Sequence, residues 1–242
     1  MKLAAGIVMA VALAGCPDLL FAAQSGRLAA PVPAPTAQAE VSFQFEREGL
    51  PVPRFTLRIR EDGMGSYQAE EAEGRSDGGE IRYASAKHID RTMSLSPATV
   101  ARIFKAVREL SRPDMNCDSK TKNIANMGKK TLNYTGAEGA SSCVYNYSDN
   151  KDVMMLTSTF LAIAYTMDEG RKLEYLHRYD RLGLDAETIE LEKAVENGRA
   201  VEIGTIEPVL TSIAGDMTVM QRARLRVVRL LEQSKSSKTG RS

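Results

Sequence analysis

The sequence has few of the residues from which catalytic and metal sites are usually built. It contains 3 cysteines and 2 histidines, and the histidines, His88 and His177, are far apart in the chain. It has no Gly-x-Ser-x-Gly elbow, no His-Glu-x-x-His, no phosphate-binding glycine loop and no Cys-x-x-Cys. The sequence therefore points to no cofactor and no metal, and it favours a non-catalytic role over an enzymatic one.

The chain also lacks an excess of either charge. It has 32 Lys and Arg against 31 Asp and Glu. Duplex nucleic acid binds basic surfaces, because its affinity depends on the release of counterions. We therefore expect no nucleic-acid partner. After residue 23, no apolar stretch reaches the ~20 residues of a membrane-spanning helix, so we expect a soluble body.

The first sixteen residues carry an export signal. Met1 and Lys2 precede a short apolar run over 3–13, and the segment ends in Leu-Ala-Gly-Cys at Cys16. A cationic start, an apolar middle and a small-residue exit are typical of a secretory signal. The ending resembles the lipobox of bacterial lipoproteins. This resemblance implies that residues 1–15 are removed and that Cys16 carries a lipid anchor in the cell envelope.

The alternative is ordinary signal cleavage. Apolar residues resume over 19–23, so a cut after Ala22 or Ala23 would discard Cys16 and release a soluble periplasmic inhibitor or carrier. Residues 16–40 favour the anchored form, because they are rich in proline and alanine. Proline fixes φ and has no N–H, which makes such a stretch an extended tether.

Cys117 and Cys143 remain as an even pair once Cys16 is acylated or discarded. In an oxidising compartment, such a pair predicts a disulfide. In the chain-entropy model the closed loop would stabilise the fold by ~3.5 kcal/mol. The alternatives are two buried free thiols or half of a metal site, and the latter lacks nearby histidines.

Residues 41–168 predict an α+β domain. Apolar residues alternate with polar ones along 41–46 and 55–60, and the glycine-containing segments 61–65 and 74–79 are typical of turns. Ser96 and Pro97 are suited to begin a helix that ends near Leu110. Two further strands are expected at 131–135 and 142–147. The result would be an antiparallel β-meander with a helix packed on one face.

The rest of the chain predicts a mainly helical region, 169–232, packed on that domain. Apolar residues recur at helical spacing from Val153 onward, Gly170 either ends or weakens the helix, and Gly183 suits a C-terminal cap. Asp185 and Asp216 are expected to cap the next acidic helix and the last helix, 217–232. We expect residues 233–242 to form a disordered tail.

One polar cluster in this region is a candidate site. Helical spacing places Asp180 three residues after His177 and Arg178 four residues after Glu174. A carboxylate that orients an imidazole is half of an acid/base device. No nucleophile accompanies the pair, so a structural ion-pair network is favoured. An enzyme that uses His177 and Asp180 is the weaker alternative.

Three arginines of the last helix, Arg222, Arg226 and Arg229, share one face. Clustered arginine attracts anionic lipid or an acidic partner. The favoured interpretation is that this basic helix packs beside the acidic helix that starts at Asp185 and ends near Asn197.

Residues 51–67 carry prolines at 51 and 53, alternating Phe55, Leu57 and Ile59, then Asp62-Gly63 and Tyr67. This pattern resembles uncharacterised exported bacterial domains. It implies an α+β sheet with a helix across one face and supplies no site. Together, these features predict a non-catalytic envelope lipoprotein. Its partners would be the membrane, through the anchor, and an unknown envelope protein or surface component.

Overall fold

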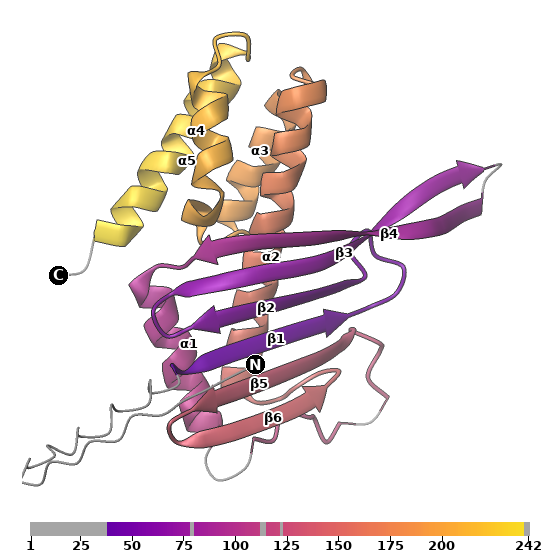
Figure 1. Cartoon of the computed structure of the whole chain (residues 1–242), viewed down its shortest axis with the longest axis vertical. Helices are drawn as coiled ribbons and strands as arrows, with labels where there is room; N and C mark the ends of the chain where they lie inside the picture. The colour runs from indigo at the N-terminus through magenta and orange to yellow at the C-terminus, as the bar shows by residue number, and fades with distance from the viewer. Residues whose placement is uncertain (1–37, 78–79, 112–114, 122, 240–242) are drawn as a thin grey trace, which may run out of the picture. The chain divides into compact units, whose positions relative to one another are not determined.

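The computed structural model describes residues 38–77, 80–111, 115–121 and 123–239. The predicted signal peptide and nearly all of the predicted tether therefore lie outside the described residues. The described chain is α+β, with the sheet in its N-terminal half and most of the helices in its C-terminal half (Figure 1). This confirms the predicted fold class. Among the described residues, no helix combines the length and the apolar character needed to cross a membrane.

The sheet has six strands in the order β4-β3-β2-β1-β5-β6, and every neighbouring pair is antiparallel. Consecutive strands β1 to β4 are neighbours, which is the predicted meander. Strands β4 and β6 are the outer strands of this sheet in the described chain. The strands are β1 (Glu40–Glu46), β2 (Arg54–Arg60), β3 (Met64–Asp77), β4 (Glu80–Ser94), β5 (Lys129–Gly136) and β6 (Gly139–Tyr145).

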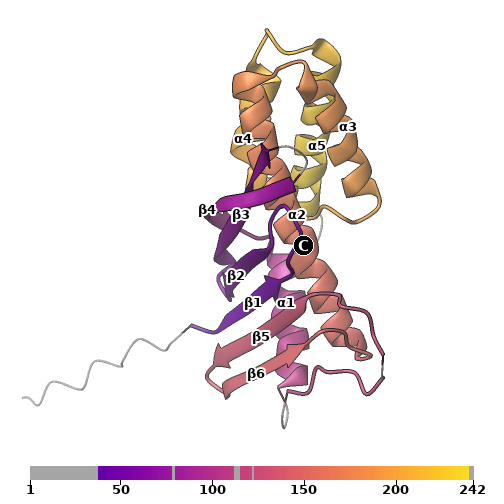
Figure 2. The same cartoon turned by 90° about the vertical axis from the view of Figure 1, so that its right-hand side faces the viewer.

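One face of the sheet is apolar and carries the core. The alternating residues of β1 pair in register with those of β2, as in the pair Phe43 and Leu57, and both side chains are fully buried. Helices α1 (Pro97–Leu110) and α2 (Lys151–Tyr179) lie across this face (Figure 2). Phe43 stacks on Phe160 of α2 with ring centroids 4.9 Å apart.

The start of α1 follows the prediction. Ser96 is the N-cap residue, its Oγ accepts the N–H of Thr99 at 3.4 Å, and Pro97 opens the helix. A second contact at this cap could not be predicted from the local sequence. Ser96 donates its backbone N–H and its hydroxyl to the carboxylate of Glu202, at 2.8 and 2.6 Å. The cap therefore ties α1 to the C-terminal helices.

Helix α2 is continuous through Gly170, so this glycine does not end it, and the boundary predicted at 168/169 lies inside the helix. The glycine is needed for close packing. A Cβ at residue 170 would lie 2.4 Å from Cγ2 of Ile206.

The C-terminal helices stand beyond the β4 side of the sheet (Figure 1). Gly183 begins α3 instead of capping α2, and Asp180 accepts its backbone N–H at 3.1 Å. Asp185 is therefore in the first turn of α3 and is not its cap. These elements are α3 (Gly183–Glu196), the short 3₁₀ helix η1 (Ile203–Ile206), α4 (Glu207–Gly215) and α5 (Gln221–Thr239).

Two other boundaries differ from the prediction. The last helix begins at Gln221, because Asp216 accepts the N–H of Thr218 in a turn before it. It continues to Thr239, so the predicted disordered tail is wrong for residues 233–239; Ser234 is buried, and its hydroxyl donates to the carbonyl of Leu231. Residues 74–77, predicted as a turn, belong to β3.

Candidate functional site

One concave surface of the described chain is an open groove of about 2400 Å³. It lies where the C-terminal part of α2 passes the outer strand β4, and Pro208, Val209 and Ser212 of α4 add a further wall. The loop between β1 and β2 contributes Leu50 and Val52. The groove thus joins the sheet to the helical region.

Strand β4 borders the groove with its edge as well as with its two faces. Residues 87–91 are five consecutive residues, and all of them line the groove. Successive side chains of a strand point to opposite faces, so a groove on one face would be lined by alternate residues only. Ile89 pairs with Ala69 on the core face, whereas Asp90 pairs with Gln68 on the opposite face.

A buried polar network fixes α2 against β3 at the base of the groove. Tyr67 is fully buried and donates its hydroxyl to Asp168 at 2.8 Å. Arg171 donates to Asp168 at 3.2 Å and to Glu71 of β3 at 2.9 Å. Burial raises the pKa of both the Tyr67 hydroxyl and the Asp168 carboxyl. Removing one partner would leave a buried polar group unsatisfied, so this network stabilises the packing of α2 on β3.

Further along α2, Arg91 of β4 donates to Glu174 at 2.7 Å. Beyond that pair, Tyr175 and Tyr179 are 62% and 66% exposed, and their ring centroids lie 5.0 Å apart. The guanidinium of Arg178 lies over the Tyr179 ring at 5.9 Å. Exposed aromatic rings beside a cation are common in binding surfaces.

His177 does not pair with Asp180, so that prediction is wrong. Its Nε2 lies 2.9 Å from the carboxylate of Asp216, which also accepts from Arg181 at 3.3 Å. The carboxylate of Asp180 instead accepts the backbone N–H of Gly183 at the start of α3. Hydrogen bonds from Thr218, then from His177 and Arg181, hold the pKa of the Asp216 carboxyl well below its usual range.

The predicted polar cluster is therefore not a single site. Glu174, His177 and Arg178 line the groove, whereas Asp180 does not, and Glu174 binds Arg91 rather than Arg178. In the described part of the chain, no hydroxyl or thiol is hydrogen-bonded to His177.

Sequence reasoning missed a pair of buried carboxyl groups at the groove, of which Glu169 lines it. Glu169 of α2 and Glu187 of α3 are both buried, and Lys172 lies 2.5 Å from Glu187. Burial, and then its hydrogen bond with Glu187, raise the pKa of Glu169 to about 7. No local pattern signals this pair, because the residues belong to different helices.

The arginines of α5 are paired, as the favoured interpretation predicted. Arg222 binds Asp185 at 2.8 Å, and Arg229 binds Glu192 at 2.9 Å. Arg226 reaches both carboxylates, at 3.4 and 3.2 Å. The arginine face of α5 was a candidate binding surface for an anionic partner. Its three arginines form ion pairs with α3 instead.

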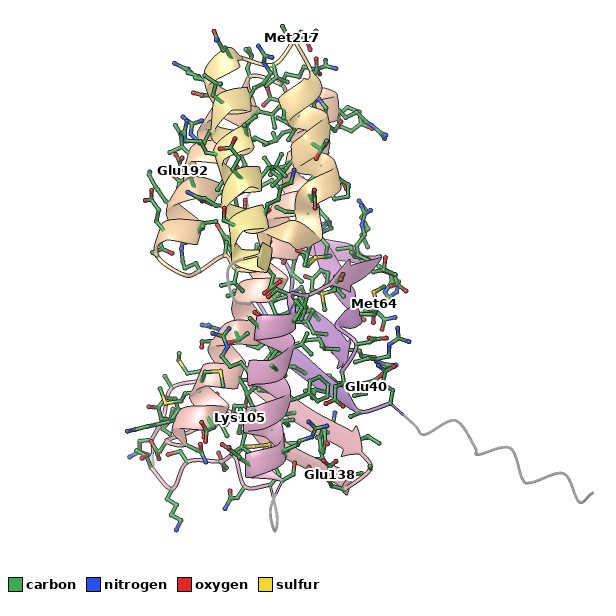
Figure 3. The ribbon with its side chains drawn as sticks, turned by 90° about the vertical axis from the view of Figure 1, so that its left-hand side faces the viewer. Glu40, Met64, Lys105, Glu138, Glu192 and Met217 are labelled. Carbon is green, nitrogen blue, oxygen red and sulfur yellow. A yellow bond between two sulfur atoms is a disulfide. The ribbon has the colours of Figure 1, made fainter. Side chains whose placement is uncertain are left out.

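The Cys117–Cys143 disulfide is present, with Cα atoms 5.9 Å apart. In the same β5–β6 hairpin, the buried Lys130 donates to the carbonyls of Met127, Gly128 and Asn146 at 3.0, 2.9 and 2.7 Å. Figure 3 shows the side chains of this part of the molecule from the α1 side, with Lys105 of α1 and Glu138 between β5 and β6 labelled. These contacts tie the segment before β5 to the end of β6.

Among the residues that the structure describes, no group of three or more His, Cys, Asp or Glu is arranged to hold a metal ion. No family model matches the chain, and a search of the curated proteins finds no similar one. Its function must therefore be argued from the groove itself.

Proposed function

We propose that this chain is a non-catalytic lipoprotein of the bacterial cell envelope and that its folded body binds another protein or surface component in the groove. The groove next to an outer strand, with two exposed tyrosines on its wall, is the observation that carries the binding role. Hollow surfaces with accessible aromatic side chains and a few placed polar groups are suited to recognition.

The proposed location rests on two features. The first sixteen residues resemble a lipoprotein signal. The body contains a disulfide, a bond that persists in oxidising compartments and is rare in the cytosol. The multiple acyl chains of such a lipoprotein give firm anchoring, because one chain alone binds a membrane only marginally.

The anchor is tested by intact-mass measurement of the mature protein and by Cys16→Ser. We expect a mature chain that starts at an acylated Cys16, and loss of both processing and membrane fractionation in the variant or with an inhibitor of lipoprotein signal peptidase. A mature chain that starts at Ala23 or Gln24 would instead identify a soluble periplasmic protein, and the anchor proposal would be withdrawn.

The binding role is tested by photocross-linking in the producing cell. A photoreactive amino acid replaces Tyr179 on the groove wall, and in a matched control it replaces Tyr147, which follows β6 and is 37% exposed. We expect a discrete adduct from position 179 and none from position 147. An absence of adducts at 179 across growth conditions would contradict the proposed binding role.

A further inference from the structure

Building on the proposed function, we propose that the groove takes an extended, acidic segment of a partner polypeptide, which adds to the sheet as a new strand along β4. Three features of the groove support this: a strand edge without a ladder partner, two cationic side chains that form no ion pair in the described chain, and the exposed tyrosine pair.

The open edge calls for a polypeptide backbone. In the described chain, β4 pairs with β3 on one side and with no strand on the other. Such an edge presents N–H and C=O groups that have no ladder partner. Residues 87–91 of this edge strand line the groove. An extended peptide has donors and acceptors at the same spacing, which is the basis of strand addition in peptide recognition.

Two cationic side chains of the groove favour a partner with acidic side chains. Lys87 and Arg178 are both exposed and line the groove. Neither forms an ion pair with a carboxylate in the described part of the chain. Three carboxylates of the groove are already bonded: Arg171 binds Glu71 and Asp168, and Arg91 binds Glu174. Asp90, on the opposite face of β4 from Lys87, accepts from Gln68. An incoming strand with Asp or Glu on its α2-facing side would complement the two unpaired cations.

The same charges disfavour a second copy of this chain as the occupant. Lys87, Ile89 and Arg91 share one face of β4. Two copies that paired antiparallel about Ile89 would place Lys87 of one opposite Arg91 of the other, and directly opposed like charges destabilise a strand pair. The exposed rings of Tyr175 and Tyr179 are then left to pack on side chains of a different polypeptide.

The probe is a library of short random peptides displayed on phage and selected against the full chain. We expect selected peptides with Asp or Glu at alternate positions. Their affinity should fall about tenfold or more in the double variant Lys87→Glu and Arg178→Glu. The matched control is Arg102→Glu on the exposed side of α1, which should bind like the wild type. Thermal melting checks that both variants are folded.

Backbone methylation of the best peptide tests the strand geometry. Only every second N–H of an added strand points to its neighbour, so N-methyl groups should abolish binding at alternate positions and be tolerated between them. Equal sensitivity at all positions, a helical periodicity, or equal binding to the double variant and the wild type would overturn the inference. So would a library that yields no binder.

These outcomes are distinct from failure of the proposed function. A cross-link from position 179 to a component that is not a polypeptide would leave the groove as the binding site and would overturn strand addition. The absence of any adduct at 179 would contradict both.

Discussion

The two outer strands of the sheet are held in different ways. Around β6, a disulfide and the buried Lys130 fasten the neighbouring segment to the sheet. Around β4, the neighbour is α2, which is joined to the sheet by polar contacts such as Arg91 to Glu174 and then continues past the edge. The β6 end of the sheet is therefore fastened by a disulfide and buried contacts, whereas the β4 end borders an open groove.

The largest effect should come from removing the disulfide at the β6 end of the sheet. The double variant Cys117→Ala and Cys143→Ala should lose about 3.5 kcal/mol of unfolding free energy, because the disulfide restricts the unfolded chain. Denaturant unfolding measures the loss. Addition of a reductant to the wild type should give a similar loss, and equal stability with and without the disulfide would contradict this view of the β6 end.

At the same β6 end, Lys130→Met should lower the free energy of unfolding by roughly 3 kcal/mol. The reason is that it leaves the carbonyls of Met127, Gly128 and Asn146 without their donor. Methionine keeps most of the packing against the rings of Phe45 and Tyr145. Lys129→Met is the matched control, since its side chain is 59% exposed, and it should change stability by less than about 0.5 kcal/mol. Similar losses in the two variants would contradict the role of Lys130.

At the other end, Gly170→Ala tests the close contact that positions α2 beside the C-terminal helices. The new Cβ would lie 2.4 Å from Ile206, and overpacking of this kind costs about 1–3 kcal/mol, more than alanine gains in helix propensity. Gly215→Ala is the control, because nothing lies within 4 Å of its Cβ position. The loss should shrink when Ile206→Ala is added, and an unchanged loss would reject this contact as its cause.

A smaller effect, on the pH dependence of stability, should come from Glu169 in the groove at the β4 end of the sheet. The pKa of Glu169 is raised to about 7, so the folded state holds its proton more tightly than the unfolded chain does. Unfolding then releases a proton between the ordinary pKa and about 7, and stability should fall as pH rises through that window.

Glu169→Gln should remove this fall and make the protein more stable than the wild type at about pH 8. Glu196→Gln, at an exposed position of the same helical region, should leave the pH profile unchanged. Thermal melting across pH measures both variants. A Glu169→Gln profile parallel to that of the wild type would show that this carboxyl group does not titrate in the window.

Local patterns in the sequence were sufficient for strands β1 and β2 and for the first helix, whereas the turn predicted at 74–79 was wrong for residues 74–77. The period-two alternation around Phe43 and Leu57 indicated two paired strands with one buried face, and Ser96-Pro97 indicated where α1 begins. These features depend on neighbours in the chain, so they are visible without the fold. The even number of cysteines left after Cys16 was enough to predict the Cys117–Cys143 bond.

The groove was not visible in the sequence, because its contacts join distant residues. His177 finds Asp216 instead of the nearer Asp180, since the turn after α2 uses Asp180 at the start of α3. Gly170 resembled a helix end, because only the fold shows Ile206 against it. Exposed tyrosines on α2 are likewise ordinary helix residues until β4 is known to lie beside them.

Amide hydrogen exchange of the full chain, measured residue by residue with and without the selected peptide, tests the central claim most directly. The account predicts that amides within residues 87–91 that do not bond to β3 exchange rapidly in the free protein and become protected in the complex, whereas β6 is unchanged. Protection confined to β6 or to the α3–α5 surface, with β4 unaffected, would contradict it.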